Sequence, residues 1–508
     1  MCGNLQLSPE SCARSGAAND HYRQVVQLRF SLLQIHEIVA CCIPGTRAPE
    51  ANYVATDLTD KKASANPTKT FFVKMITKDI LLEDCILDLI DNSVDGAWRT
   101  EGSRPMGLSE GADLSKYSIS ITLSPTSFRI LDNCGGMTLD DAVNHAFSFG
   151  RPATETNQDY SIGVYGIGMK RAVFKLGADI KIRSTFTDEN KQRVPFAVPI
   201  NVPTWAANDA PPWDFDIDSD EPLDQDGVEI VVNGLTSGAS RAFDSPSFLQ
   251  NLRRTIARDY TLHMNRGLKI SINGRLIVGT QIELRASDDF TPLHVEYKDE
   301  TEGMEVAIEI IGGMLAPPPD TLEPDEKADS ENPYGWYVGC NGRIVLAADK
   351  STVAGWGADG WPIWHPQYAG FLGLILFTAA NPAALPLTTT KRNVDTTSEV
   401  FRRARPRMRD VTRKWIDYTN ARKQALEEAK AKEREAALVS IYHLQKVDAV
   451  KLPALTARTG PAPANVNYAV PVTRMKKLAK ALGSINLPYR DVGLKSFDYT
   501  YNELVGDE

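Results

Sequence analysis

The sequence has no apolar run that reaches the length of about 18 residues needed to cross a membrane. The apolar stretch Ile38 to Ile43 is too short for the core of a signal peptide, and charged residues interrupt the stretch before it. We therefore expect a cytoplasmic protein without a membrane segment.

Cysteine is scarce, and basic charge is not in excess. The seven cysteines are an odd number and their spacings fit no zinc pattern, so we expect reduced thiols. The net charge of −9 gives no general attraction to DNA or acidic membranes, and such a contact would need a local basic patch. At 508 residues the chain has room for two or three domains of about 150 residues each.

The most informative feature present is a helix with acidic residues along one side. The polar members recur at three- and four-residue steps and so share one face: Asp84, Asp88, Asp91, Asn92 and Asp95. The residues between them are mostly apolar, as in a core helix. Carboxylates on a core helix are costly unless they meet a metal, a water or a ligand, which predicts a polar cavity. The alternative is an amphipathic helix with a solvated acidic face.

Two glycine-rich segments follow this helix. In the first, an apolar alternating run over 117–131 predicts a strand that ends at Asp132, and the next glycines let the backbone approach a flat ligand. In the second, Ser161 to Lys170, glycines precede a helix predicted over 169–176, where free N–H groups favour a phosphate. Each segment alone is weak evidence, since turns use glycine everywhere. The second also mimics a dinucleotide fingerprint, but a polar stretch stands where that motif needs a strand.

Taken in order, acid-x-x-x-Asn, Asp-x-x-x-Gly and Gly-x-x-Gly-x-Gly resemble the motifs of GHKL ATPases. This family includes DNA gyrase B subunits, MutL, MORC proteins, heat-shock chaperones of the ninety-kilodalton class and sensor histidine kinases. The motifs cover residues 67–235, and a looser likeness extends to about residue 395. The resemblance implies an α+β chain: a GHKL (Bergerat) α/β sandwich, then a transducer-like α/β domain and a C-terminal helical region. It also implies ATP and Mg²⁺ as cofactors.

The resemblance assigns roles to single residues. Asn92 matches the asparagine that holds Mg²⁺, and Asp132 matches the aspartate that bonds the adenine amino group. Further expected nucleotide contacts are Asp95, Gly136, Met137, Gly163, Gly166, Gly168 and Lys170.

The chain also departs from the family pattern. Asp88 stands where hydrolytic members carry a glutamate that activates water, and its side chain is one methylene shorter. A shorter reach predicts slow hydrolysis, because a general base must come within hydrogen-bond distance of the water. Cys134 replaces a glycine of the first glycine segment, and Val228 lacks the hydroxyl of the family's Gly-Thr strand.

A late loop, Leu385 to Asp395, resembles the transducer loop that brings a lysine to the γ-phosphate. Lys391 is the candidate, since an ammonium there stabilises transition-state charge and senses the terminal phosphate. The alternative is a polar loop with a solvated lysine. Asn341-Gly-Arg343 is predicted to be a plain hairpin turn.

Composition divides the chain into five parts. They are an N-terminal extension over 1–66, an ATP-binding domain over 67–240, a transducer-like domain over 241–397, a charged helix over 398–450 and a tail over 451–508 with a small basic helix. The charged helix is expected to be either a lone surface helix or a dimer arm. The basic and aromatic tail fits either a nucleic-acid grip or a docked terminal helix.

The function implied by the resemblance is a slow, Mg²⁺-dependent ATPase that acts as a conformational switch. We expect a homodimer on ATP binding, with DNA or a protein client as partner, in a role such as defence. The alternative is a nucleotide-binding scaffold with little or no turnover. A histidine kinase is disfavoured, because no charged helix surrounds His36, a candidate phospho-acceptor before the nucleotide motifs.

Overall fold

The computed structural model describes most of the chain beyond residue 66. Its ranges are 67–102, 107–108, 113–148, 160–162, 166–210, 213–320, 332–358, 360–388, 390–455 and 466–506. The N-terminal extension expected over 1–66 lies outside them. Within these ranges no helix combines the length and the apolar character that a membrane crossing requires.

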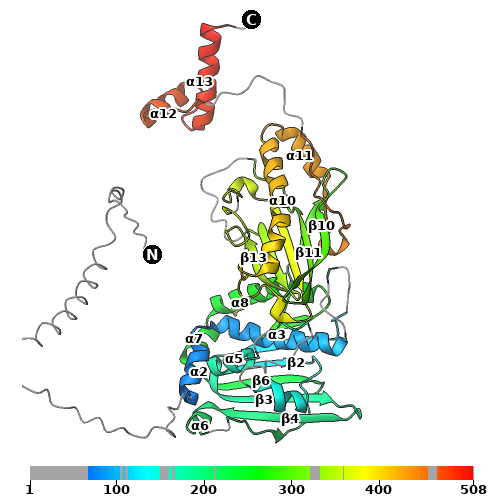
Figure 1. Cartoon of the computed structure of the whole chain (residues 1–508). Helices are drawn as coiled ribbons and strands as arrows, with labels where there is room; N and C mark the ends of the chain where they lie inside the picture. Colours follow the sequence, from blue (N-terminus) through cyan, green and yellow to red (C-terminus); the bar gives the residue numbers. More distant parts are fainter. Residues whose placement is uncertain are drawn as a thin grey trace, which may run out of the picture. The chain divides into compact units, whose positions relative to one another are not determined.

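The first domain is built on an eight-stranded sheet with the order β5-β4-β3-β6-β2-β1-β7-β8 (Figure 1). Neighbouring strands are antiparallel except β1 and β7, which run parallel. The strands are β1 (Ser118–Leu123), β2 (Ser127–Asp132), β3 (Gly177–Thr187), β4 (Arg193–Asn201), β5 (Asp218–Ser219), β6 (Gly227–Leu235), β7 (Lys269–Ile272) and β8 (Arg275–Ile277).

Helices α2, α3 and α5 lie along one face of this sheet, as in an α/β sandwich (Figure 1). The helices of the domain are α2 (Lys69–Lys78), α3 (Leu82–Glu101), α4 (Leu139–Asp141), the π-helical turn η2 (Ala142–Ala146), α5 (Gly168–Leu176), α6 (Val202–Ala206), α7 (Ser237–Phe243), α8 (Pro246–Asp259) and α9 (Thr261–Met264). The α+β class and the sandwich expected from the motifs are confirmed.

Helix α3 carries the acidic residues identified in the sequence. Two acids, Glu83 and Asp84, lie in its first turn, where negative charge suits the helix dipole. It ends at Gly102, whose left-handed φ of 67° lets its N–H donate to the carbonyl of Arg99. Twelve of its residues are buried, so α3 is a core helix, as its apolar residues predicted.

Two expectations for this domain need correction. The run over 117–131 is not one strand but the hairpin β1–β2, because Ser124 and Ser127 close a tight turn through hydrogen bonds to each other. The domain also continues past residue 240: β7 and β8 extend its sheet, and Leu252 and Ile256 of α8 lie in its core. Strand β7 therefore belongs to the first domain, although residues 241–397 were expected to form the second one.

The second domain contains a five-stranded sheet with the order β10-β11-β14-β12-β13 and a small two-stranded sheet, β15-β9. The strands are β9 (Glu283–Ala286), β10 (Leu293–Thr301), β11 (Met304–Met314), β12 (Gly335–Cys340), β13 (Arg343–Asp349), β14 (Phe371–Thr378) and β15 (Ala437–Ser440). The helices are α10 (Glu399–Arg422) and α11 (Leu426–Glu435), with 3₁₀ turns η3 (Pro366–Tyr368), η4 (Pro382–Ala384) and η5 (Ile441–His443).

Strand β14 is buried over its whole length because the sheet is covered on both faces. Phe371, Ile375 and Phe377 pack with α10, whereas Leu372, Leu374 and Leu376 pack with Leu262 of α9. The second contact joins the second sheet to α9 of the first domain, which brings the β12–β13 turn close to α3.

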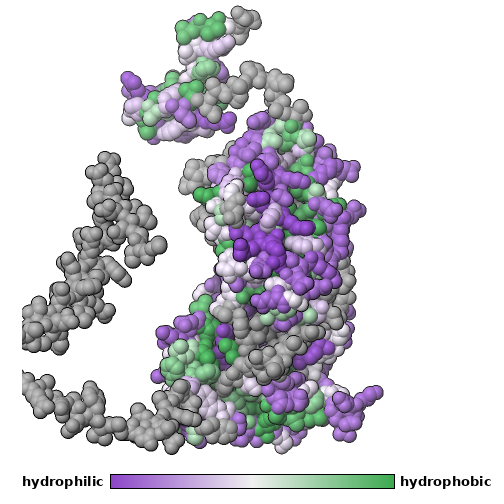
Figure 2. Space-filling view, in the orientation of Figure 1, coloured by the Kyte–Doolittle hydropathy of each residue, from purple (hydrophilic) through white to green (hydrophobic). Residues whose placement is uncertain are grey.

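The charged segment after residue 398 is neither a lone surface helix nor an arm. One face of α10 is buried in the second core through Phe401, Met408 and Trp415, and the opposite face forms the hydrophilic surface seen over this helix in Figure 2. The high charge of the segment concealed this apolar stripe.

Residues 466–506 contain α12 (Val472–Ala481) and α13 (Tyr489–Leu504). The small basic helix predicted from the sequence is α12. Ala479 and Val492 are buried in this pair of helices, while Phe497 and Tyr501 stack on its surface.

Candidate functional site

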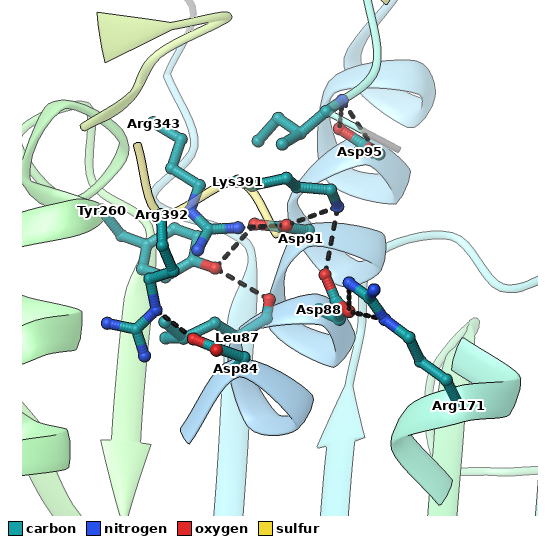
Figure 3. A network of polar contacts seen from close by, with 11 residues as sticks. Asp84, Leu87, Asp88, Asp91, Asp95, Arg171, Tyr260, Arg343, Lys391 and Arg392 are labelled. Carbon is teal, nitrogen blue, oxygen red and sulfur yellow. Dashed lines mark hydrogen bonds and ion pairs between the residues drawn. The ribbon is translucent and has the colours of Figure 1, made fainter. Parts of the chain in front are cut away.

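The first half of the acidic stripe on α3 is buried under basic side chains (Figure 3). Asp91 is fully buried; its Oδ2 accepts from Lys391 Nζ at 2.9 Å and from Arg343, and its Oδ1 accepts from the Tyr260 hydroxyl at 2.7 Å. Burial alone raises the pKa of Asp91, but Arg343 and Lys391 outweigh it and hold the pKa below its ordinary value. Asp91 is therefore a buried anion shared by two cations.

Asp88 lies one turn earlier and is also buried. Its Oδ2 accepts from Arg171 Nε at 2.9 Å and Nη2 at 2.6 Å, and Lys391 Nζ lies 3.3 Å from its Oδ1. Each carboxylate oxygen thus faces a positive charge. Further along the helix, Asp84 pairs with Arg392, which lies next to Lys391 in the sequence.

At Asp84, Asp88 and Asp91 the stripe meets basic side chains, a result that neither prediction from the sequence, a polar cavity or a solvated face, included. Four cations from outside α3 contact it: Arg171 on α5, Arg343 on β13, and Lys391 and Arg392 on the late loop. The stripe therefore contacts the second domain, and it also carries the candidate catalytic carboxylate.

Lys391 comes from a short closed loop. Leu387 and Val394 form a β-bridge at its base, and the Lys391 N–H donates to Thr388 O at 2.9 Å. Lys391 has a left-handed φ of 54° and is buried. Burial lowers its pKa, but Asp91 and Asp88 outweigh this effect and raise it, so the ammonium stays charged. Lys391 is therefore not a solvated loop lysine.

The turn Asn341-Gly-Arg343 is the predicted hairpin between β12 and β13, but it does more than reverse the chain. Asn341 and Gly342 have φ of 44° and 83°, as a two-residue hairpin turn requires. The Asn341 amide donates to Ser161 O and Ala379 O at 3.0 and 3.1 Å, and Arg343 bonds Asp91. The sequence analysis missed Arg343, and an Asn-Gly turn followed by a charged residue was its only signal.

Asp132 lies at the end of β2 on the buried face of the strand, two residues beyond Ile130. Its Oδ1 accepts from the N–H groups of Cys134 and Val228 at 2.9 and 3.2 Å, and its Oδ2 accepts from the Ser93 hydroxyl at 2.6 Å. Burial raises the pKa of Asp132, against the effect of these three bonds. Ser93 of α3 thus bonds Asp132 through its hydroxyl, whereas Val228 bonds it through the backbone N–H alone.

The first glycine segment forms a tight turn next to Asp132. Gly136 has a φ of 77°, and a Cβ there would lie 2.2 Å from the Thr185 carbonyl oxygen. Met137 is fixed on both sides by Ser184, whose hydroxyl bonds the Met137 N–H at 2.8 Å and the Met137 carbonyl at 2.9 Å. Only glycine fits this turn, as predicted.

The second half of α3 has different surroundings. Asn92 is exposed, and the structure shows no hydrogen bond from it to another described residue. Asp95 is half-buried and accepts from the Ile162 N–H at 2.9 and 3.1 Å through its two oxygens. Asp95 therefore holds the chain directly before the second glycine segment.

The second glycine segment is described in part, and Gly163 lies outside the described residues. Gly166 has a φ of 65°, and Gly168 begins α5 without a capping side chain. Lys170 is buried, and its Nζ donates to the carbonyls of Ala146 and Ser148 at 2.8 and 2.5 Å. Its amine thus bonds the end of η2, while the neighbouring Arg171 reaches Asp88.

This geometry agrees with the comparison with protein families. Residues 80–218 match the model described as histidine kinase-, DNA gyrase B-, and HSP90-like ATPase. This domain belongs to the GHKL superfamily. The match contains α3, both glycine segments and the strands β1 to β4. A search of curated proteins finds no match, and the likeness of the second domain to a transducer stays a prediction.

Proposed function

We propose that the GHKL domain binds ATP with Mg²⁺ next to Asn92, which lies in the second half of α3. Asn92 offers an exposed amide oxygen, a ligand type that Mg²⁺ accepts. The uncapped start of α5 offers N–H groups to phosphate, and Asp132 keeps acceptor capacity on Oδ2 for the adenine amino group. Bound Mg²⁺ would neutralise phosphate charge at Asn92.

Asp88 is our candidate for the general base, and Lys391 is our candidate for the residue that senses the γ-phosphate. The observation that carries this proposal is the 3.3 Å distance between Lys391 Nζ and Asp88 Oδ1. The two residues are far apart in the sequence, and only the docking of the second domain brings them together. A lysine that contacts both the base and the terminal phosphate would make ATP hydrolysis depend on the position of the second domain.

We further propose that ATP drives closure of a homodimer. ADP lacks the γ-phosphate and should not favour the closed form, because a ligand shifts an equilibrium only by its differential contacts. A non-hydrolysable ATP analogue should therefore raise the dimer fraction in light scattering, and ADP should not. Lys391→Ala should weaken that response and leave ADP binding intact. The same mass with analogue, ADP or no nucleotide would contradict the switch.

A scaffold with little turnover is the second candidate. Arg171 donates to Oδ2 of Asp88 and Lys391 lies 3.3 Å from its Oδ1, so both oxygens are engaged and less acceptor capacity is left for a water. Steady-state turnover with purified protein distinguishes the two candidates. The same assay with added DNA tests the expected nucleic-acid partner, since a DNA-dependent switch should turn over faster on DNA.

A further inference from the structure

Arg171 makes the closest contact to the proposed base. Its Nε and Nη2 both donate to Asp88 Oδ2, at 2.9 and 2.6 Å, and the side chains are 12% and 3% exposed. Two N–H groups of one rigid guanidinium meet at Oδ2, which fixes the place of this oxygen more strictly than a single ammonium contact would. The Asp88 Oδ2 is therefore held from the side of α5.

The start of α5 leaves little space between this helix and Asp88. A Cβ on Gly168 would lie 3.4 Å from Asp88 Cγ and 3.5 Å from its Oδ2. Arg171 lies three residues further along α5, on nearly the same side of the helix. The glycine allows the close approach, and the arginine then bonds the carboxylate. Asp88 is thus tied to the same helix end that is proposed to receive the phosphates.

We propose that Arg171 is a positioning residue for Asp88. It occupies Oδ2 and so leaves Oδ1, the oxygen beside Lys391, directed to the reaction site. This role rests on the proposed function of Asp88 as the base. Its placement of the carboxylate matters for this site, because a general base must lie within hydrogen-bond distance of the water.

The test measures ATP turnover of Arg171→Gln in the wild-type and in the Asp88→Asn background. A base held in the wrong orientation loses efficiency, so we expect Arg171→Gln to lower kcat roughly 10- to 100-fold with little change in KM. In the Asp88→Asn background the same change should have little further effect, because Arg171 acts through Asp88. Arg171→Lys retains the charge without the two-pronged contact and should lie between wild type and Arg171→Gln.

Lys175→Gln is the matched control on the same helix. Lys175 donates to the Thr77 carbonyl at 2.7 Å and not to Asp88, so its loss should leave kcat unchanged. Thermal unfolding of each variant checks the fold, and Arg171→Lys serves if Arg171→Gln does not fold.

Three outcomes would overturn the proposal. The first is an equal loss of kcat from Arg171→Gln in both backgrounds, which would show that Arg171 acts independently of Asp88. The second is a change in KM alone, which would make Arg171 a nucleotide contact. The third is wild-type kcat in Arg171→Gln while Asp88→Asn is inactive, which would show that Asp88 is the base but that Arg171 does not position it. Wild-type turnover in Asp88→Asn would instead show that Asp88 is not the general base.

Discussion

The two halves of α3 carry the same kind of polar residue, but the surroundings of these residues differ. In the first half the carboxylates are buried, and each bonds a basic side chain from another element (Figure 3). In the second half Asn92 is exposed, and Asp95 is half-buried and accepts from the backbone N–H of Ile162. A regular spacing of acids thus predicts which side chains share a face, but not whether that face meets a cation or a ligand.

This difference indicates that the two halves of α3 have different roles. Buried ion pairs fix geometry because an unpaired charge in the interior is costly. Asp91 therefore secures the second domain to α3 through Arg343 and Lys391. Asp88 lies in the first half and is paired like Asp91, but it is one turn before Asn92. We infer that the first half of α3 holds the domains together and the second half receives the nucleotide.

The largest effect is expected at Asp91. Asp91→Asn removes the negative charge shared by two buried cations, so the free energy of unfolding should fall by about 3–5 kcal/mol. Urea unfolding followed by circular dichroism measures this loss. Asp95→Asn is the control from the other half of the helix, and its loss should stay below about 1 kcal/mol, since an amide oxygen still accepts from Ile162. Equal losses in both variants would contradict the comparison.

Asp88 should affect turnover more than stability. An amide at this position cannot take a proton from water, so Asp88→Asn should lower ATP turnover by roughly 100-fold or more. Nucleotide affinity should change little, because Asp88 is not one of the expected nucleotide contacts. A coupled phosphate-release assay gives the rate, and unchanged turnover would assign the base to another group.

The turn at Gly136, directly after β2, lies next to Asp132 and can be tested through its backbone. Gly136→Ala would place a Cβ 2.2 Å from a carbonyl oxygen at a φ of 77°, which should cost about 1–3 kcal/mol of unfolding free energy. Gly102→Ala is the matched control: its φ is 67°, but nothing lies within 4 Å. It should cost about 1 kcal/mol from backbone strain alone. A smaller loss at Gly136 than at Gly102 would contradict this account.

The smallest effect is expected at Ser93. Ser93→Ala removes the hydroxyl that donates to Asp132 Oδ2, and the loss should be about 1 kcal/mol in unfolding free energy. Thr126→Ala, in the exposed β1–β2 turn, should change stability by less than about 0.5 kcal/mol. If Ser93→Ala were as neutral as this control, the bond between the Ser93 hydroxyl and Asp132 would not contribute to stability.

Local features of the sequence were enough to predict the GHKL domain. The spacing on α3, the start of α5 near Gly168 and the position of Asp132 at the end of β2 follow from short-range periodicity and glycine chemistry. The β1–β2 turn was missed because Pro125 is the only strong turn signal in an alternating run.

Contacts between distant segments could not be predicted in the same way. Arg343 and Lys391 lie 252 and 300 residues beyond Asp91, and no local pattern states that they meet one carboxylate. Lys391 was assigned by resemblance, and Arg343 was not assigned at all. For α10, the abundant charge masked an apolar face that only the second sheet reveals.

The most direct measurement is calorimetric titration with a non-hydrolysable ATP analogue and Mg²⁺. Wild type and Asp84→Asn, which loses only an ion pair in the first half of α3, should bind with similar affinity. Asn92→Ala should show no measurable binding, because it lacks the proposed Mg²⁺ ligand. If Asn92→Ala binds as tightly as wild type, the second half of α3 is not the nucleotide site.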